Sequence, residues 1–177
     1  MPLDNEEKAL FRAAVAGARR LRCDRAELAP VRRRIPRHAA ELPQAAHDPW
    51  PDALEPAPVG AGAELFFTRP GPRERQLRLL RQGRLAIDAE LDLHGQTVAE
   101  ARHALAGFLA ACHAHDARVV RLISGKGNRT GEGRAVLKSH LNQWLRSDPR
   151  ILAFATPPPR HGGSGALLVL LRAAQDR

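Results

Sequence analysis

Apolar and polar residues alternate in one stretch near the middle of the chain. Leu91 and Leu93 alternate with Asp92 and His94, which is the two-residue period of a β-strand. Successive side chains of a strand point to opposite faces, so we expect the leucines on one face and the Asp/His pair on the other. Gly95 should end the strand. The pair then lies at the carboxyl end of a strand, where α/β sheets bind their ligands.

The pattern that follows this strand predicts alternating helices and strands. Thr97 and Glu100 have the spacing of a capping box, so a helix should begin there and continue to about His113. The order of elements is β-α-β-α-β-β, which predicts an α/β fold with a mixed four-stranded sheet, its first three strands parallel and its last antiparallel. The later predicted elements are a strand over 118–123, a helix over about 134–146, a strand over 151–156, a loop over 157–165 and a strand over 166–172.

The first half of the chain has a different character. Residues 4–25 show a helical pattern with a narrow apolar stripe and many arginines, which is typical of a basic amphipathic helix. Such a helix packs on its own domain, lies on a membrane or docks on a partner, and the pattern favours the first and the last of these equally. Nine of the 14 prolines lie between Pro30 and Pro72, which predicts a semi-rigid linker that ends in one short helix. The predicted parts are a basic helix over 1–29, a linker over 30–86 and a globular domain over 87–174.

Basic residues outnumber acidic ones, and this narrows the classes of partner. The chain has 28 Lys and Arg against 19 Asp and Glu, a formal net charge of +9. Such an excess favours a polyanionic partner, either nucleic acid or an anionic membrane surface. The two cysteines lie in unrelated contexts, so we expect neither a disulfide nor a zinc framework. No apolar run approaches membrane-spanning length, and a cytoplasmic protein is the simplest prediction.

Three segments that are distant in sequence should meet at one edge of the predicted sheet. If the first three strands are parallel, their carboxyl ends lie side by side. The first strand ends at Asp92 and His94, and the second is followed by Ser124-Gly125-Lys126-Gly127. The loop after the third strand contains Arg160-His161-Gly162-Gly163. We therefore predict one pocket built from these three segments.

The glycine-rich stretch 124–133 is a candidate anion-binding loop. Glycines let the backbone approach an anion closely, and N–H groups at the start of a helix favour phosphate. Lys126 and Arg129 add full positive charges. The stretch lacks the G-x-x-x-x-G-K-[ST] pattern, which disfavours nucleotide hydrolysis. A surface loop with incidental charge is the alternative, and it weakens if the loop lies opposite Asp92 and His94.

The histidines and carboxylates of this edge suggest proton transfer. His94 has the chemistry of a general base or acid near neutral pH, with Asp92 to orient it. Asp92 is alternatively a structural carboxylate that caps Gly95. His161 is a second candidate proton carrier, or an ordinary loop residue. Asp92 and Glu90 are the only carboxylates at the first strand, so we predict no metal site.

Three motifs in this order resemble the Smr (small MutS-related) domain. They are Leu91-Asp92-Leu93-His94-Gly95, then Ser124-Gly125-Lys126-Gly127, then Gly162-Gly163-Ser164-Gly165-Ala166 with an apolar strand. The resemblance covers about Glu90 to Arg172, and residues 10–25 resemble more loosely the start of stand-alone bacterial Smr proteins. It implies a two-layer sandwich with two helices on one face of the sheet. Many members carry His or Thr where this chain has Ser124, so His161 or solvent would have to carry protons here.

The resemblance also implies endonuclease activity, with the D-x-H pair and the G-K-G loop as its active region. We expect general acid/base catalysis without a cofactor. The candidate catalytic residues are Asp92, His94 and Lys126, and the candidate nucleic-acid-binding residues are Ser124, Gly125, Gly127, Arg129, Arg160, His161 and Gly163.

An endoribonuclease that cleaves mRNA on stalled or collided ribosomes is the favoured prediction. A DNA-nicking or branched-DNA-binding protein is one alternative, and a non-catalytic RNA-binding adaptor that docks on the ribosome through the N-terminal helix is another. Composition does not separate RNA from DNA, because both are phosphate polymers. With no Tyr, five Phe and two Trp, the chain is poorly equipped for extensive base stacking.

Overall fold

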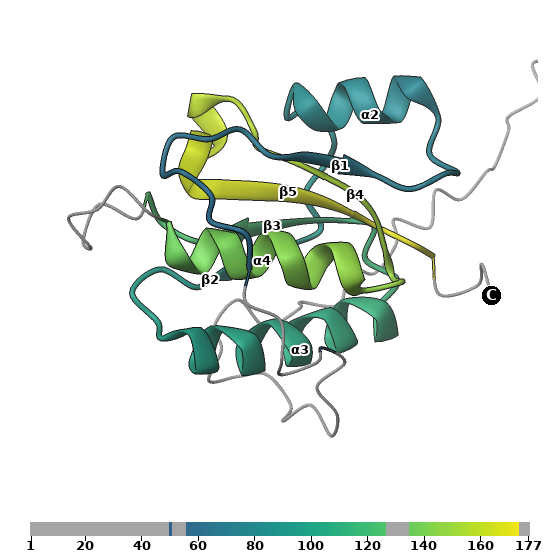
Figure 1. Ribbon diagram of the computed structural model, residues 1–177. Helices are drawn as coiled ribbons and strands as arrows, with labels where there is room; N and C mark the ends of the chain where they lie inside the picture. The colour runs from purple at the N-terminus through teal and green to yellow at the C-terminus, as the bar shows by residue number, and fades with distance from the viewer. Residues whose placement is uncertain (1–49, 51–55, 127–134, 174–177) are drawn as a thin grey trace, which may run out of the picture. The chain divides into compact units, whose positions relative to one another are not determined.

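A computed structural model describes residues 50, 56–126 and 135–173, which are drawn in colour in Figure 1. The predicted N-terminal helix and two predicted site residues, Gly127 and Arg129, lie outside the described residues. No helix in the described part is both long and apolar enough to span a membrane. The elements are β1 (Phe66–Thr68), α2 (Glu74–Arg81), β2 (Ala89–Asp92), α3 (Val98–Ala114), β3 (Val119–Ile123), α4 (Val136–Ser147), β4 (Ile151–Ala155) and β5 (Ala166–Leu171), with short 3-10 helices at Pro159–His161 and Gly163–Gly165.

The described strands form one mixed sheet in the order β1-β4-β5-β3-β2. β2 and β3 pair in parallel, and β5 is antiparallel to both of its neighbours, β3 and β4. β2, β3 and β4 therefore run in one direction and β5 in the other, which confirms the predicted directions. β5 lies between β3 and β4, so the third of the predicted parallel strands is not adjacent to the first two.

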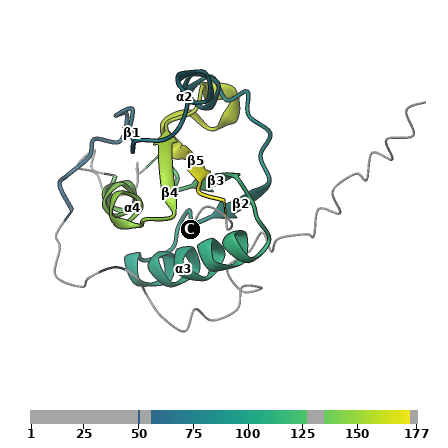
Figure 2. The ribbon, with the colours of Figure 1, turned by 90° about the vertical axis from the view of Figure 1, so that its right-hand side faces the viewer.

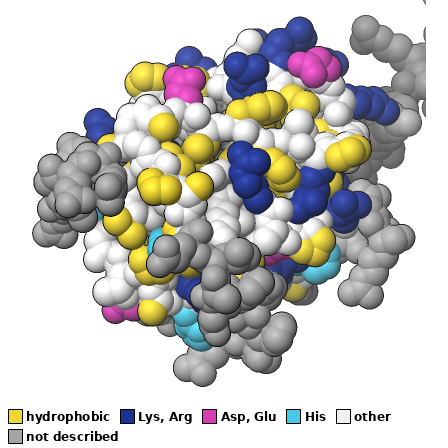
Figure 3. All heavy atoms as spheres, in the orientation of Figure 1, with side chains coloured by type: hydrophobic (Ala, Val, Ile, Leu, Met, Phe, Trp, Pro, Cys, Tyr) yellow, Lys and Arg dark blue, Asp and Glu magenta, His cyan; other side chains and the backbone are white. Residues whose placement is uncertain are grey.

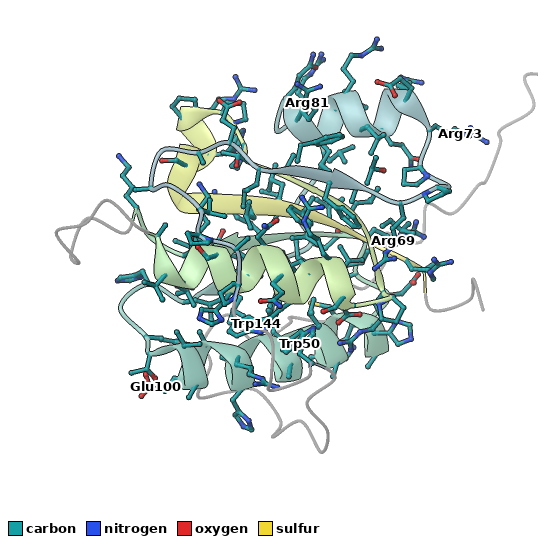
Figure 4. The ribbon with its side chains drawn as sticks, in the orientation of Figure 1. Trp50, Arg69, Arg73, Arg81, Glu100 and Trp144 are labelled. Carbon is teal, nitrogen blue, oxygen red and sulfur yellow. The ribbon has the colours of Figure 1, made fainter. Side chains whose placement is uncertain are left out.

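The sheet has five strands rather than the predicted four, because part of the predicted linker belongs to it. β1 pairs antiparallel with β4, with Phe67 opposite Phe154. Trp50 also comes from the predicted linker, yet it is buried and stacks on Trp144 with 5.5 Å between ring centroids (Figure 4). Three strand residues between prolines and glycines are too few to show a period. The sheet and its hydrophobic core therefore include residues that precede position 87.

Helices cover both faces of this sheet (Figure 2). α3 and α4 pack on one face, as the resemblance implies, and form the larger hydrophobic cluster with Leu91, Leu122 and Val169. α2 packs on the opposite face, which the two-layer prediction left bare. Its buried Leu77 and Leu80 form a second hydrophobic cluster with residues of β3, β4 and β5.

β5 is the strand on which both layers depend, because all six of its residues are buried. Leu167, Val169 and Leu171 belong to the cluster beneath α3 and α4, whereas Leu168 and Leu170 belong to the cluster beneath α2. A strand buried on both faces has a continuous apolar sequence rather than an alternating one. The run Ala166–Leu171 has this sequence.

The start of α3 is held by the predicted capping box. The Thr97 hydroxyl accepts from the Glu100 N–H at 3.3 Å, and the Glu100 carboxylate accepts from the Thr97 N–H at 2.8 Å. The backbone N–H and the hydroxyl of Thr97 each donate to the Glu100 carboxylate at 2.8 Å, and these two hydrogen bonds lower the pKa of Glu100. Gly95, with φ of 75°, makes the turn between the end of β2 and this cap. The chain therefore leaves the sheet and enters α3 within a few residues of His94.

Candidate functional site

Asp92 and His94 form a hydrogen-bonded pair where β2 ends. The imidazole Nδ1 lies 2.6 Å from Asp92 Oδ1, and the backbone N–H of His94 donates to the same oxygen at 3.0 Å. The His94 side chain is 70% exposed and the Asp92 side chain is 36% exposed. With Nδ1–H donating to the carboxylate, Nε2 is left as the basic nitrogen of a neutral imidazole. The pair thus presents a proton acceptor to solvent.

The glycine-rich segment after β3 lies directly beside this pair. Asp92 is in register with Ile123, and the Leu93 N–H continues the ladder to the Ile123 carbonyl at 2.8 Å. A Cβ atom on Gly125 would lie 3.5 Å from Cβ of His94. Gly125 has a φ of +74°, a conformation that side chains other than glycine rarely adopt. Lys126, which is exposed, therefore follows a sharp turn at the position next to His94.

The start of β5 supplies the third segment. The Gly165 carbonyl accepts from the N–H groups of Ser124 at 2.9 Å and Gly125 at 3.1 Å. A Cβ on Gly165 would lie 3.3 Å from Lys126 Cγ, so only glycine allows this close approach without displacing the lysine. The structure therefore brings Asp92, His94, Gly125 and Lys126 together.

Ser124 has a different environment from the other predicted site residues. Its side chain is buried, and the single hydrogen of its hydroxyl is shared between the carbonyls of Gly125 and Gly165, each 3.3 Å away. These contacts hold the turn that carries Lys126. Ser124 was predicted to contact nucleic acid, but its described contacts are with the protein backbone.

Arg160 and His161 lie against α2 rather than beside His94 in their described contacts. Arg160 Nη2 donates to the Gln82 carbonyl at 2.7 Å, just after α2 ends. The His161 ring packs on Gly83, where an added Cβ would lie 2.6 Å from its Cδ2 atom. The predicted proton-transfer role of His161 therefore has no described contact with the Asp92/His94 pair to support it. Gly163, two residues further on, begins the short helix that leads to Gly165.

Lys138 is a buried cation beside this edge that the sequence analysis did not single out. Its side chain is 1% exposed, and Nζ donates to the carbonyls of Ala63 and of Ser164, the latter at 2.9 Å. Burial lowers the pKa of Lys138, and the nearby Glu64 carboxylate opposes this shift. Lys138 thereby ties α4 to the turn before β5. One signal was available, because Lys occurs at only three positions in a chain rich in Arg.

The remaining carboxylate of β2 is engaged elsewhere. Glu90 forms an ion pair with Arg121, its register partner on β3. Among the described residues, no group of three or more His, Cys, Asp or Glu side chains is placed to hold a metal ion. A shallow depression of about 720 Å³ runs from His94 along the start of α3 past Ala99, Glu100 and His103.

Comparison with known proteins identifies the same region. The family model described as "Smr domain" matches residues 91–172. Ribosome rescue factor SmrB of Pectobacterium carotovorum subsp. carotovorum (strain PC1) is 33% identical over 176 residues, which are 96% of this chain and 92% of that protein. SmrB of Escherichia coli O157:H7 (strain EC4115 / EHEC) is 32% identical over 177 residues, 96% of this chain and 91% of that protein.

A solved structure agrees with these sequence matches. The crystal structure of YdaL, a stand-alone small MutS-related protein from Escherichia coli, has a TM-score of 0.56 and 35% identity to this chain. The similarity covers 64% of this chain and 87% of YdaL. The fold, the motifs and the relatives agree, and the chain belongs to the Smr family.

Proposed function

We propose that this chain is an endoribonuclease that cleaves mRNA on stalled or collided ribosomes. The observation that carries the proposal is the Asp92/His94 pair, 2.6 Å apart, with Nε2 presented to solvent beside the turn of Lys126. The relatives that share nearly the full length of the chain are named ribosome rescue factors, which points to a ribosome-bound mRNA as substrate. The net charge of +9 suits a polyphosphate substrate.

In the proposed reaction His94 acts as general base. Nε2 takes the proton of a ribose 2′-hydroxyl, and the 2′-oxygen forms a bond to the adjacent phosphorus. The bond from phosphorus to the 5′-oxygen of the next nucleotide breaks, and that oxygen takes a proton from water. The products are a 2′,3′-cyclic phosphate and a free 5′-hydroxyl. Asp92 holds the imidazole in the tautomer that this step needs and stabilises the imidazolium that forms.

Lys126 is the group that we assign to the charge that develops on the phosphate. The N–H groups of Ser124 and Gly125 are occupied by the Gly165 carbonyl, so they are not free to bind an oxyanion. An exposed ammonium on a tightly held turn supplies the positive charge instead. Replacement of Lys126 by Met should therefore slow cleavage more than it weakens RNA binding.

The mechanism can be tested on a substrate that lacks the attacking group. A single 2′-deoxy nucleotide at the cut site should abolish cleavage by the wild-type protein, and a chelator should leave cleavage of all-RNA substrate unchanged. His94→Ala should reduce the rate by about 10²–10⁴-fold, the usual contribution of a general base. His115→Ala, an exposed histidine after the far end of α3, is the matched control and should cut normally. Continued cutting at the deoxy position would overturn the mechanism, and loss of cutting with chelator would indicate a metal.

A second experiment tests the substrate. Wild type and His94→Ala are compared on mRNA carried by collided ribosomes, on the same RNA without ribosomes, and on supercoiled plasmid. We expect cutting by wild type to be fastest on the collided ribosomes. Nicking of plasmid at a matching rate would favour a DNA nuclease, and full ribosome rescue in cells by His94→Ala would favour a non-catalytic adaptor.

A further inference from the structure

The face of the sheet covered by α2 carries a groove that the proposed cleavage chemistry does not use. The groove has a volume of about 580 Å³ and lies between α2, the proline-rich segment after β4 and the segment before β1. Figure 3 shows dark blue basic side chains gathered around α2 in the upper part of that view. The lining of the groove includes Arg78 and Arg81 of α2, Gly163 and Ser164 before β5, and the carboxylates of Glu64 and Glu74.

One short turn of the chain joins the lining of this groove to the candidate site. Gly163 and Ser164 line the groove, and Gly165, the next residue, holds the turn of Gly125 and Lys126. The segment Arg160–Ser164 is held at two points, because Lys138 donates to the Ser164 carbonyl and Arg160 donates to the Gln82 carbonyl. The turn Gly163–Gly165 is therefore the segment that separates the groove lining from the turn of Lys126.

The arginines of α2 are available for a ligand. Leu77 and Leu80 bury one side of the helix, and Arg75, Arg78 and Arg81 are exposed. In the described part of the chain none of these three arginines forms an ion pair, although Glu74 lies one turn from Arg78. A free guanidinium donates two parallel hydrogen bonds to a phosphate, which makes it a natural phosphate contact.

An exposed aromatic ring adjoins these arginines. Phe66 of β1 is 43% exposed, and the Arg81 guanidinium lies over its ring, 5.3 Å from the centroid. Figure 4 shows Arg81 at one end of α2 and Arg73 at the other. The planar guanidinium and the exposed part of this ring together offer an unpaired nucleobase a stacking surface, whereas a duplex keeps its bases stacked inside.

We propose that this groove binds the single-stranded stretch of RNA next to the bond that is cut. Arg78 and Arg81 contact its phosphates, and Phe66 with Arg81 stacks one base. The carboxylates of Glu64 and Glu74 also line the groove, so the phosphates should follow the arginine side and keep away from these two residues. The proposal deepens the proposed function, on which it rests for the identity of the substrate.

The test measures binding in a form of the protein that does not cut. All variants are full-length chains carrying His94→Ala, and the probe is a fluorescein-labelled 20-nucleotide unstructured RNA followed by anisotropy. Arg78→Ala/Arg81→Ala is compared with Arg75→Ala/Arg84→Ala, which removes the same charge from exposed residues outside the groove. We expect the groove variant to bind at least tenfold more weakly, with a salt slope reduced by about 1.4, or about 0.7 per lost phosphate contact. The control pair should stay within threefold of its parent.

Phe66→Leu supplies an independent arm, because it keeps an apolar strand residue and removes the ring. It should weaken binding of this RNA by about fivefold or more, the least expected from one lost stacking contact. Equal losses in the two arginine pairs, or unchanged binding in both the groove pair and Phe66→Leu, would overturn the proposal. These readouts do not depend on cleavage, so failure of the proposed chemistry and failure of the groove give different results.

Discussion

At the scale of single residues, the site depends on direct contacts between neighbouring groups. One carboxylate oxygen of Asp92 accepts from both the backbone N–H and the Nδ1–H of His94, so the ring is held although it is largely exposed. Gly125 and Gly165 lie where a side chain would be strained or would displace a neighbour. The exposed pair contributes little to stability, since surface ion pairs are weak. Its proposed role is therefore chemical.

Asp92→Asn should separate a role of Asp92 in catalysis from a role in stability. It removes the charge that stabilises the imidazolium, so the cleavage rate should fall by about 10²-fold or more. The free energy of unfolding should change by less than about 1 kcal/mol, because the pair is exposed. Glu90→Gln, the neighbouring carboxylate on the same strand, is the control and should cut within threefold of wild type. Equal rates for the two variants would contradict the role of Asp92.

Cys112 gives a pH-dependent prediction at the same scale. Burial raises the pKa of its thiol from its ordinary value of 9.0 to about 12. Between these values the unfolded chain ionises this thiol and the folded chain does not, so stability should fall as the pH rises above 9. Cys112→Ala removes this effect. Compared with pH 8, wild type at pH 10 should lose about 1.4 kcal/mol more than the variant in urea unfolding under reducing conditions. If the free energy of unfolding changed with pH in the same way in wild type and in Cys112→Ala, folding would not protect the thiol from ionisation.

At the scale of elements, α4 and α2 support the candidate site from opposite sides of the sheet. Lys138 extends from the first turn of α4 to the Ser164 carbonyl, and Arg160 joins the same loop to the end of α2. A buried ammonium without a hydrogen-bonded carboxylate is costly, and the start of a helix is an unfavourable place for it. The buried position of Lys138 therefore fits a role in holding the turn that positions Gly165.

Lys138→Met tests the energetic part of this argument. The folded-state pKa is lowered, so the unfolded chain binds the proton more tightly. The free energy of unfolding of the wild type should therefore increase with pH between the folded-state pKa of Lys138 and about 10.5. The increase should be at most about 1.4 kcal/mol per pH unit. Lys138→Met should lack this gain in denaturant titrations at pH 8 and 10.5. Lys126→Met, which removes an exposed lysine, should keep it. A gain that persists in Lys138→Met would assign it to another group.

At the scale of the whole molecule, β5 joins two hydrophobic layers. Alternate residues of one continuous apolar run pack beneath α3 and α4 on one face and beneath α2 on the other. The same strand starts at Gly165, so the core and the candidate site share one element. Damage to the α2 layer should therefore destabilise the whole domain.

Leu168→Ala makes this quantitative. Leu168 is fully buried in the α2 cluster, and its truncation should cost about 2–5 kcal/mol of unfolding free energy. Leu152→Ala is the control, because Leu152 packs on the same cluster but is only partly buried. Its cost should be clearly smaller in the same urea titration. A Leu168→Ala cost below 1 kcal/mol would mean that α2 contributes little to stability.

Much of this architecture could be predicted from the residue pattern, because the signals are local. The period of Leu91–His94, the capping spacing of Thr97 and Glu100, and the apolar run before Arg172 each reflect forces between near neighbours in the chain. From these patterns we predicted the strand directions, the Asp92/His94 pair and the adjacent glycine turn. Three motifs in order were sufficient for the family.

The tertiary structure alone decided the features that depend on contacts distant in sequence. β1 is only three residues long and exists because β4 offers a free edge to pair with. In the sequence Lys138 has the character of an ordinary helix residue. Its contacts with the carbonyls of Ala63 and Ser164 exist only in the folded structure. His161 and Arg160 were predicted at the active edge, but α2 lies next to them and takes their contacts. The sequence by itself determined the local chemistry of Asp92 and His94, whereas packing determined which of the distant groups lie beside them, because which segments meet depends on how the whole chain packs.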